Sequence, residues 1–376
     1  MKEKKLKEII IYEIKEKGPI PFSKYMDLCL YHPEYGYYRQ KHPPIGKIGD
    51  YYTSPCVHKV FGYIIAKHII EIINDIDNEK FYIVEAGAGS GYLLRDIGEY
   101  FSSRYPEILD KVHIIIIEPN KFYREIQFNS FSRFFKDVIF IDFPHELPEF
   151  NGVFYSNELF DSMPVEILQT DQNGKIRQVF VDFKDDKFIE VIDKPDEELI
   201  AFLNKWHIKI PENFRTEVSI AMEFFYNQVV KKIKKGAVLT IDYGYPRSEL
   251  FDASHNRGTL MCYYKHTVTE NPYIRTGIQD ITFHIDFTLL KDIGEKAGMK
   301  TLGFIEQSYF LMGTGIIEEL EKIKNENFDN YQAEVIKIKN LILPGGMGDT
   351  FKFFEQCKGI SIIPKGFSLK NKINTL

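Results

Sequence analysis

The 376-residue sequence lacks the features that mark a membrane or nucleic-acid-binding chain. Its longest aliphatic run, IIII at 114–117, is too short to cross a bilayer, so we expect a buried strand there. The formal net charge of -6 gives no overall attraction to nucleic acid. No internal repeat or low-complexity tract is present, and the length suggests one elaborated domain or two.

Cysteine is scarce. The four cysteines, Cys29, Cys56, Cys262 and Cys357, are scattered and form no C-x-x-C pair. This argues against a zinc site and a disulfide framework, and it fits a reducing compartment. The opening MKEKKLKEIIIYEIKEKG mixes acids with lysines and has no small-residue cleavage site, so it predicts an amphipathic helix and not a secretory signal. We therefore expect a cytoplasmic protein without a metal.

Short apolar runs alternate with amphipathic stretches between residues 81 and 157. The predicted elements are strand 81–86, helix 91–103, strand 112–118, helix 120–130, strand 138–142 and strand 152–157. Continuous apolar strands at this spacing indicate a parallel sheet covered on both faces.

The flanking segments are expected to add helices, a hairpin and two further strands. The expected elements are helix 3–17, a helix after Pro21, helix 56–75, hairpin 175–192, helix 217–235, strand 236–244, irregular insert 245–283, helix 286–297, strand 299–307, a helical stretch 316–340 and strand 350–359. The tyrosine-rich stretch from residue 31 to 55 should be irregular.

A glycine-rich turn joins the first core strand to its helix. FYIVEAGAGSGYLLRDI, 81–97, lacks the dinucleotide fingerprint G-x-G-x-x-G and instead has Glu85 ahead of Gly87, Gly89 and Gly91. Glycines there allow positive φ and a close approach of backbone to a ligand at the carboxyl end of the sheet. A carboxylate at Glu85 would repel a pyrophosphate but attract an ammonium, directly or through water.

The next strand also ends in an acid, Glu118 in IIIIEPN. A carboxylate at that place suits a ribose diol because it can accept hydrogen bonds from both hydroxyls. S-adenosylmethionine carries a ribose diol and an ammonium but no phosphate, so the two acids favour this cofactor over NAD. In the alternative interpretation the glycines form only a tight crossover and the acids are solvated.

The third strand ends at FIDFPHELP. Asp142 could accept from the adenine amino group while Phe143 packs on the ring. The alternative is a turn acid beside a core aromatic residue.

A second group of polar residues follows the fourth strand, in YSNELFDSMP at 155–164. Asn157, Glu158 and Asp161 should emerge where the transferable methyl would lie. Such groups can orient a nitrogen nucleophile and accept its proton. Asp161 could instead cap the following helix, which makes Glu158 the better catalytic candidate.

Several stretches together resemble the MidA-like methyltransferases, a family that includes a mitochondrial complex I assembly factor acting on protein arginine. The matching stretches are GDYYTSP (49–55), EAGAGSG (85–91), EPN (118–120), SNELFDSMP (156–164), IDYG (241–244), RGTLMCYYKH (257–266), GIQDITFHIDF (277–287) and GMGDTFK (346–352). The resemblance implies a Rossmann-like class I α/β fold: a seven-stranded, mostly parallel sheet with helices on both faces and an antiparallel last strand. It also implies S-adenosylmethionine as cofactor and symmetric arginine dimethylation.

The resemblance implies roles for further residues. Gly49, Asp50, Thr53 and Ser54 would belong to a segment that closes over the cofactor. The residues of an insert roofing the pocket would be His266, Gln279, Asp280 and His284, of which Gln279 and Asp280 favour function and His284 structure. A guanidinium would be paired by Glu158 with Asp161 or Asp242.

The sequence departs from the family pattern at three positions that bear on the acceptor. Ser90 stands where an arginine is common in the glycine loop, and Cys56 and His58 replace the usual Glu and Ser. Combined with the resemblance, the elements divide the chain into an N-terminal segment 1–45, a cofactor-binding core 46–165, an inserted hairpin and helix 166–234, a core strand 235–245, a roof insertion 246–290 and a C-terminal part of the core 291–376.

The interpretation is therefore a methyltransferase that acts on a protein side-chain nitrogen, with no nucleic acid or membrane partner and a homodimer as one possibility. One alternative is an assembly or binding factor that keeps the fold without turnover and uses the tyrosines of 31–38 as partner contacts. A nucleotide-dependent oxidoreductase is disfavoured by the missing dinucleotide fingerprint. A nucleic-acid methyltransferase is disfavoured by the charge and by the absence of an N-P-P-Y tetrapeptide.

Overall fold

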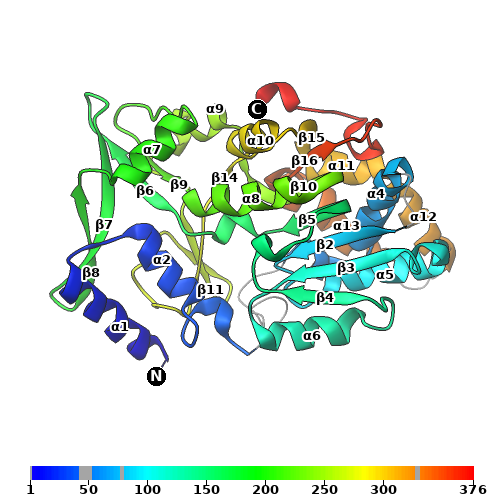
Figure 1. Ribbon diagram of the computed structural model, residues 1–376, viewed down its shortest axis with the longest axis horizontal. Coiled ribbons are helices and arrows are strands. Elements are labelled where there is room, and N and C mark those ends of the chain that lie inside the picture. The colour runs from blue at the N-terminus through cyan, green and yellow to red at the C-terminus, as the bar shows by residue number, and fades with distance from the viewer. Residues whose placement is uncertain (1, 42–52, 77–79, 327–330) are drawn as a thin grey trace.

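The computed structural model describes residues 2–41, 53–76, 80–326 and 331–376 and contains a central twisted sheet (Figure 1). The order of its strands is β15-β16-β10-β5-β2-β3-β4, and a short β14 pairs with β10. These strands are β2 (Phe81–Ala86), β3 (Val112–Ile117), β4 (Val138–Ile141), β5 (Phe150–Asn157), β10 (Ile233–Tyr245), β14 (Ile285–Asp286), β15 (Lys300–Glu306) and β16 (Phe351–Lys358). Only β16 runs antiparallel to its neighbours in the main path, which confirms the predicted class I arrangement.

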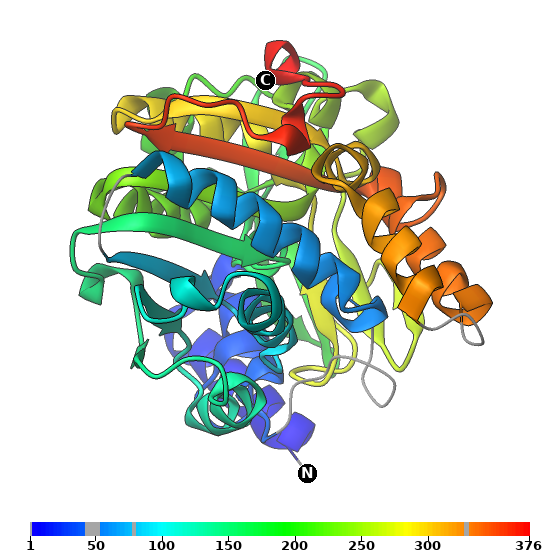
Figure 2. The ribbon, with the colours of Figure 1, turned by 90° about the vertical axis from the view of Figure 1, so that its right-hand side faces the viewer.

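Helices pack against both faces of this sheet because its strands are apolar on both sides. Successive residues of β2 point to opposite faces, so Ile83 and Val84 belong to two separate buried clusters. The helices of the first face are α4 (Val60–Ile76), α5 (Tyr92–Arg104), α6 (Lys121–Phe131), α11 (Gln307–Thr314) and α13 (Tyr331–Ile342). Those of the second face are α8 (Ile220–Lys232) and α10 (Phe287–Lys296). Figure 2 shows α4 lying across the first face.

One predicted helix is interrupted, and the predicted helical stretch holds more than one helix. The expected helix 56–75 is α3 (Ser54–Val57) followed by α4, because His58 is extended and its Nδ1 accepts from the Val60 amide at 3.0 Å. The expected stretch 316–340 holds α12 (Ile316–Glu326) and α13 and is preceded by α11, which ends at left-handed Gly315. Two short helices, α9 (Arg247–Leu250) and α14 (Met347–Thr350), complete the core.

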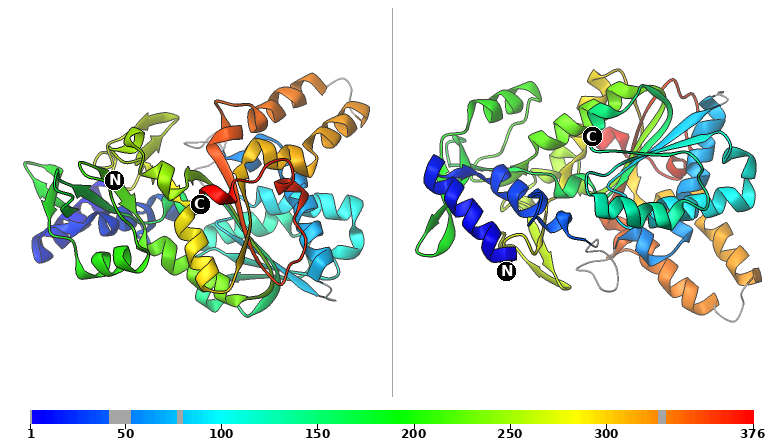
Figure 3. Two further views of the ribbon diagram at one scale, coloured as in Figure 1. Left: turned by 90° about the horizontal axis from the view of Figure 1, so that it is seen from above. Right: turned by 60° about the horizontal axis from the view of Figure 1, so that its bottom comes forward.

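The first insertion extends well beyond a hairpin. The predicted hairpin is present as β7 (Ile176–Lys184) and β8 (Lys187–Asp193), and it belongs to a five-stranded sheet. The other strands are β1 (Ile20–Pro21), β6 (Glu166–Thr170) and β9 (Arg215–Val218). The helices α1 (Lys2–Lys17), α2 (Phe22–Tyr31) and α7 (Glu197–Lys205) complete this lobe, which lies at the end of the molecule opposite α12 (Figure 3).

The second insertion is not irregular as predicted, because it folds into a three-stranded sheet. Its strands are β11 (Met261–Tyr264), β12 (Thr267–Thr269) and β13 (Asp280–Thr282). The pairing of β11 with β13 joins residues about twenty positions apart, and a local pattern does not reveal it.

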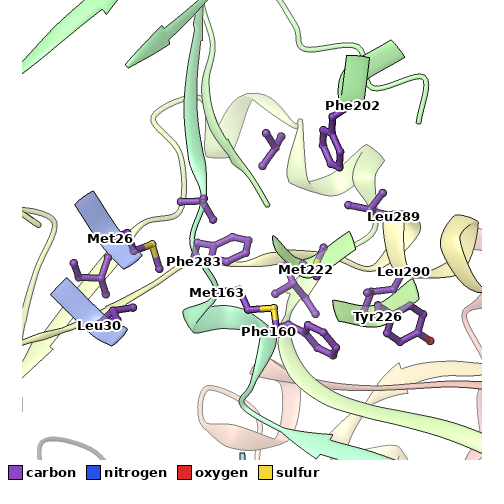
Figure 4. Close-up of a cluster of buried hydrophobic side chains, with 14 of the residues drawn as sticks. Met26, Leu30, Phe160, Met163, Phe202, Met222, Tyr226, Phe283, Leu289 and Leu290 are labelled. Atoms are coloured by element: carbon purple, nitrogen blue, oxygen red, sulfur yellow. The ribbon is translucent and has the colours of Figure 1, made fainter. Parts of the chain in front are cut away.

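One continuous hydrophobic core joins the lobes. Met26 and Leu30 of α2 belong to the same buried cluster as Met163 and Phe283 (Figure 4). The cluster continues to Met222 of α8 and into the second face of the central sheet. The N-terminal segment is thereby held at the carboxyl edge of that sheet.

Candidate active site

A cavity of about 640 Å³ lies at the carboxyl ends of β2, β3, β4 and β5. Its lining includes four acidic side chains, those of Glu85, Glu118, Asp142 and Glu158. This is the edge at which open parallel sheets bind ligands. The structure thus brings together the acids that end four successive strands.

The glycine loop forms the floor of the cavity. Gly87, Gly89 and Gly91 have φ values of +69°, +53° and +74°, which confirms the expected left-handed backbone. A Cβ added at Gly91 would lie 3.0 Å from Cα of Gln127. The glycine therefore lets α6 approach the start of α5 closely.

Glu85 is the most enclosed of the four acids. Its side chain is buried, and its Oε2 atom has no hydrogen-bond partner among the described residues. Burial raises the pKa of the carboxyl to about 8, although the neighbouring Tyr155 hydroxyl lowers it. A bound ammonium would supply the missing partner and favour the ionised form.

The Glu118 carboxylate accepts hydrogen bonds from two residues, Asn120 and Gln127, that the sequence analysis did not identify as site residues. Its Oε1 accepts from the Asn120 amide at 2.8 Å and its Oε2 accepts from Gln127 Nε2 at 3.0 Å. Burial raises the pKa of the carboxyl despite these bonds. Each oxygen keeps a second lone pair, as recognition of a diol requires. Gln127 also donates to the Gly89 carbonyl at 3.1 Å, so one amide ties Glu118 to the glycine loop.

Asp142 and Phe143 also line the cavity, and their assignment to adenine stays a prediction. The Asp142 carboxylate forms an ion pair with Arg124, whose Nε donates to the Glu118 carbonyl at 2.6 Å. The ring of Phe143 is 52% exposed and stacks on His145 with centroids 5.7 Å apart, so it is not a core residue.

The end of β5 presents Asn157 and Glu158. Glu158 has a φ of +53°, and its amide donates to the Ile241 carbonyl at 2.8 Å. A left-handed backbone at a non-glycine residue costs energy and is typical of functional sites. Oε1 of Glu158 accepts from Asn157 Nδ2 at 3.0 Å, and Oδ1 of Asn157 has no hydrogen-bond partner in the parts of the chain that the structure describes. Burial, and then the nearby Asp161, raise the pKa of Glu158 well above its usual range.

Asp161 and Asp242 lie behind the cavity wall. The Oδ2 atom of Asp242 accepts from the Phe160 amide at 2.9 Å and less closely from the amides on either side. Asp161 accepts from the Tyr243 hydroxyl, and burial raises its pKa to about 6. Asp242 thus braces the turn after β5, whereas the sequence interpretation placed it in the substrate pocket.

The predicted roof residues do not line the cavity. Gln279 is buried and donates to the Asn271 carbonyl at 3.1 Å, while His266 is exposed in the turn between β11 and β12. Asp280 accepts from the Tyr38 hydroxyl at 2.8 Å and so backs the cavity through that tyrosine. His284, expected to be structural, packs between Tyr243 and Tyr245, and burial lowers its pKa to about 4.

The segment around α3 contributes Thr53 and Cys56 to the cavity lining, and the glycine loop contributes Ser90. Ser54 is fully buried and donates to Gln307 at 3.1 Å. His58 lies outside the cavity, with its Nε2 2.5 Å from Glu334 of α13. Gly49 and Asp50 fall outside the described residues.

The sequence analysis missed the three residues that cover the cavity from the N-terminal segment: Tyr31, Tyr38 and Arg39. The Tyr31 and Tyr38 rings stack with centroids 5.5 Å apart and an angle of 23° between their planes. The Tyr31 hydroxyl donates to the Ser162 carbonyl at 3.1 Å. The richness of this stretch in tyrosine was a signal, but it did not show which way the rings face.

The comparisons with known proteins agree with this geometry. Residues 64–305 match a family model described as "Putative S-adenosyl-L-methionine-dependent methyltransferase". The chain belongs to this family. It is 28% identical to a protein from Burkholderia thailandensis whose crystal structure contains S-adenosyl-homocysteine; the match has a TM-score of 0.90 and covers 100% of this chain and 97% of that one.

Curated relatives are also similar along most of the chain. The Xenopus laevis relative is named protein arginine methyltransferase NDUFAF7, mitochondrial; it is 27% identical, with 97% of this chain and 86% of the relative covered. The human protein of the same name is 26% identical, with 92% and 81% covered.

The chain is an S-adenosylmethionine-dependent methyltransferase, and its residues fit the cofactor. The buried Oε2 of Glu85 lacks a partner that the ammonium would supply, and Glu118 offers acceptors to the ribose. In the described ranges, no group of three histidine, cysteine or acidic side chains is arranged to hold a metal. No helix within those ranges is long and apolar enough to cross a membrane.

Proposed function

We propose that the methyl acceptor is an arginine guanidinium in a protein substrate. The observation that carries this proposal is the Glu158 carboxylate in a cavity whose lining also includes the stacked rings of Tyr31 and Tyr38. A carboxylate pairs with a planar guanidinium, and aromatic faces attract it. The relatives named as protein arginine methyltransferases support the same acceptor.

Glu158 has the properties of a proton acceptor for this reaction. The bound donor supplies a methyl group on a sulfonium, so a nitrogen–carbon bond forms as a carbon–sulfur bond breaks. The guanidinium nitrogen must lose a proton at that point. Burial raises the pKa of Glu158, so the carboxyl is neutral in the empty site and ionises when a cationic acceptor binds beside it. Asn157 then holds the carboxylate in place.

The test is methyl transfer from labelled S-adenosylmethionine to two synthetic peptides that differ only in a central arginine or lysine. We expect label on the arginine peptide alone. Glu158→Gln should lower kcat by about 100-fold or more, because a general base contributes that much, without changing donor affinity. The exposed Glu107→Gln is the matched control and should behave as wild type.

Two outcomes would contradict the proposal. Label on the lysine peptide, or only on small molecules when a lysate of the parent organism is used, would exclude arginine as the acceptor. Donor binding with no transfer to any peptide or lysate component would instead favour the assembly-factor interpretation.

We also propose a cytoplasmic location for the protein. The support is that all four cysteines are free and three of them are buried, as suits a reducing compartment. The curated relatives are named mitochondrial, so fractionation of cells followed by immunoblotting distinguishes the two. A homodimer stays a prediction that sedimentation of the purified protein can check.

A further inference from the structure

Arg39 occupies a fixed position at the rim of the cavity. It ends a short 3-10 helix, Tyr37–Arg39, and its amide donates to the Gly36 carbonyl at 3.0 Å. The carbonyls on either side of it, those of Tyr38 and Gln40, both accept from Asn120 Nδ2, at 3.0 and 3.1 Å. A single buried amide at the end of β3 therefore holds the backbone around Arg39 over the donor site.

The Arg39 guanidinium lies close enough to the Glu118 carboxyl and the Tyr123 hydroxyl for its charge to act on both. Burial raises the pKa of each group, and the positive charge of Arg39 opposes that rise. Across the described parts of the chain, no hydrogen bond or ion pair involves its guanidinium, although it lines the cavity. The acids that line the same cavity all end strands of the sheet. Arg39 is the only arginine or lysine among the described lining residues. A guanidinium that lines a cavity and forms no hydrogen bond or ion pair with the described residues is suited to an anionic group of a ligand.

S-adenosylmethionine carries one anionic group, the α-carboxylate of its amino-acid end. The other recognisable groups are accounted for: Glu85 suits the ammonium, Glu118 the ribose and the segment at Asp142 the adenine. Of the charged groups that line the cavity, Arg39 alone has the sign that a carboxylate needs. We propose that Arg39 binds the α-carboxylate of the methyl donor through bidentate, charge-assisted hydrogen bonds.

The test compares two ligands on several variants by isothermal titration calorimetry, without turnover. The ligands are S-adenosylmethionine and its decarboxylated analogue, which keeps the ammonium, the sulfonium and the adenosine. Wild type should prefer the complete donor. Arg39→Leu should weaken binding of the complete donor about tenfold to a hundredfold, as expected for a lost charged hydrogen bond, and leave binding of the analogue nearly unchanged.

Two further variants control for charge and for folding. Arg39→Lys should recover part of the loss, because it keeps the charge but not the planar fork. Arg133→Leu removes an arginine that is 66% exposed and outside the cavity, so both affinities should stay at the wild-type value. Thermal unfolding of the ligand-free variants shows whether each is folded.

Three results would overturn the proposal. Arg39→Leu could lower the affinity for both ligands by the same factor, which would place Arg39 against the adenosine or the sulfonium. The variant could leave both affinities unchanged, or the wild-type protein could bind both ligands with equal affinity. None of these results depends on the identity of the acceptor, so this inference stands or falls separately from the arginine assignment.

Discussion

At the scale of single residues, the site depends on acids that are costly to ionise until a cation arrives. Burial raises the pKa of Glu85 to about 8, so its carboxyl is mostly neutral in the free protein at pH 6 to 7. Only the ionised form attracts an ammonium strongly. Donor binding must therefore release a proton from Glu85, and the affinity must rise with pH.

We predict that donor affinity increases about tenfold between pH 6 and pH 7, because the ionised fraction of Glu85 increases by that factor. The rise should level off near pH 8, where Glu85 is ionised and the donor ammonium begins to lose its own proton, as α-amino groups do at about pH 8. Titration calorimetry in two buffers of different ionisation enthalpy measures both affinity and proton release. Glu85→Gln should bind more weakly with a flat profile over this range. A flat wild-type profile would show that Glu85 does not pair with the ammonium.

The sequence predicted the residues at strand ends more reliably than those brought in from elsewhere. Glu85 and Glu118 each follow an apolar run directly, and Glu158 comes directly after β5, so a local pattern places all three at the carboxyl edge of the sheet. The parallel register then brings the strand ends together. Tyr38 and Arg39 reach the same cavity from a segment whose position depends on Asn120, about eighty residues away, and no local pattern carries that information.

At the scale of elements, the strands of the central sheet were predicted more reliably than the strands of the three-stranded sheet in the second insertion. The bounds of β2, 81–86, agree with the prediction because its apolar run ends in a glycine turn. The strands β11 and β13 are short, and their pairing depends on tertiary contacts, so the segment was predicted to be irregular. The family resemblance placed His266 in a roof over the pocket, whereas the hairpin turn exposes it.

The centre of the main sheet is sensitive to one missing side chain. Gly152 of β5 lies opposite Tyr82 of β2 and Gly236 of β10. Its φ is +148°, and an added Cβ would lie 1.9 Å from the Tyr82 carbonyl oxygen. We predict that Gly152→Ala lowers the free energy of unfolding by about 3 kcal/mol or more, because backbone must move in the middle of the sheet.

Gly298→Ala is the matched control for that variant. Gly298 also has a positive φ, +84°, but nothing lies within 4 Å of an added Cβ. Its substitution should cost only the left-handed backbone, about 1 to 2 kcal/mol. Denaturant unfolding monitored by circular dichroism compares the two. Equal losses would mean that the collision at Gly152 is relieved at no cost.

At the scale of the whole molecule, the cavity lies where the N-terminal segment meets the central sheet. Tyr38 of the N-terminal segment contacts both the central sheet and the second insertion. Its carbonyl accepts from Asn120 at the end of β3, and its hydroxyl donates to Asp280 of β13. Glu85 and the glycine loop belong to the central sheet, while Tyr31 and Arg39 belong to the segment that covers the cavity, residues 31–41 (the covering segment). A donor bound between them therefore contacts both parts at once.

We predict that S-adenosylmethionine slows hydrogen exchange in the covering segment, residues 31–41, as well as in the glycine loop, residues 85–91. At a free concentration 100 times Kd the ligand should add about 2.7 kcal/mol to the stability of the native state. Tyr38→Phe removes the hydroxyl that donates to Asp280, so protection of residues 31–41 should fall while that of residues 85–91 persists. Mass spectrometry of peptic fragments resolves the two segments in one experiment. If the donor protected the glycine loop and left residues 31–41 unchanged in wild type, the covering segment would not be part of the donor site.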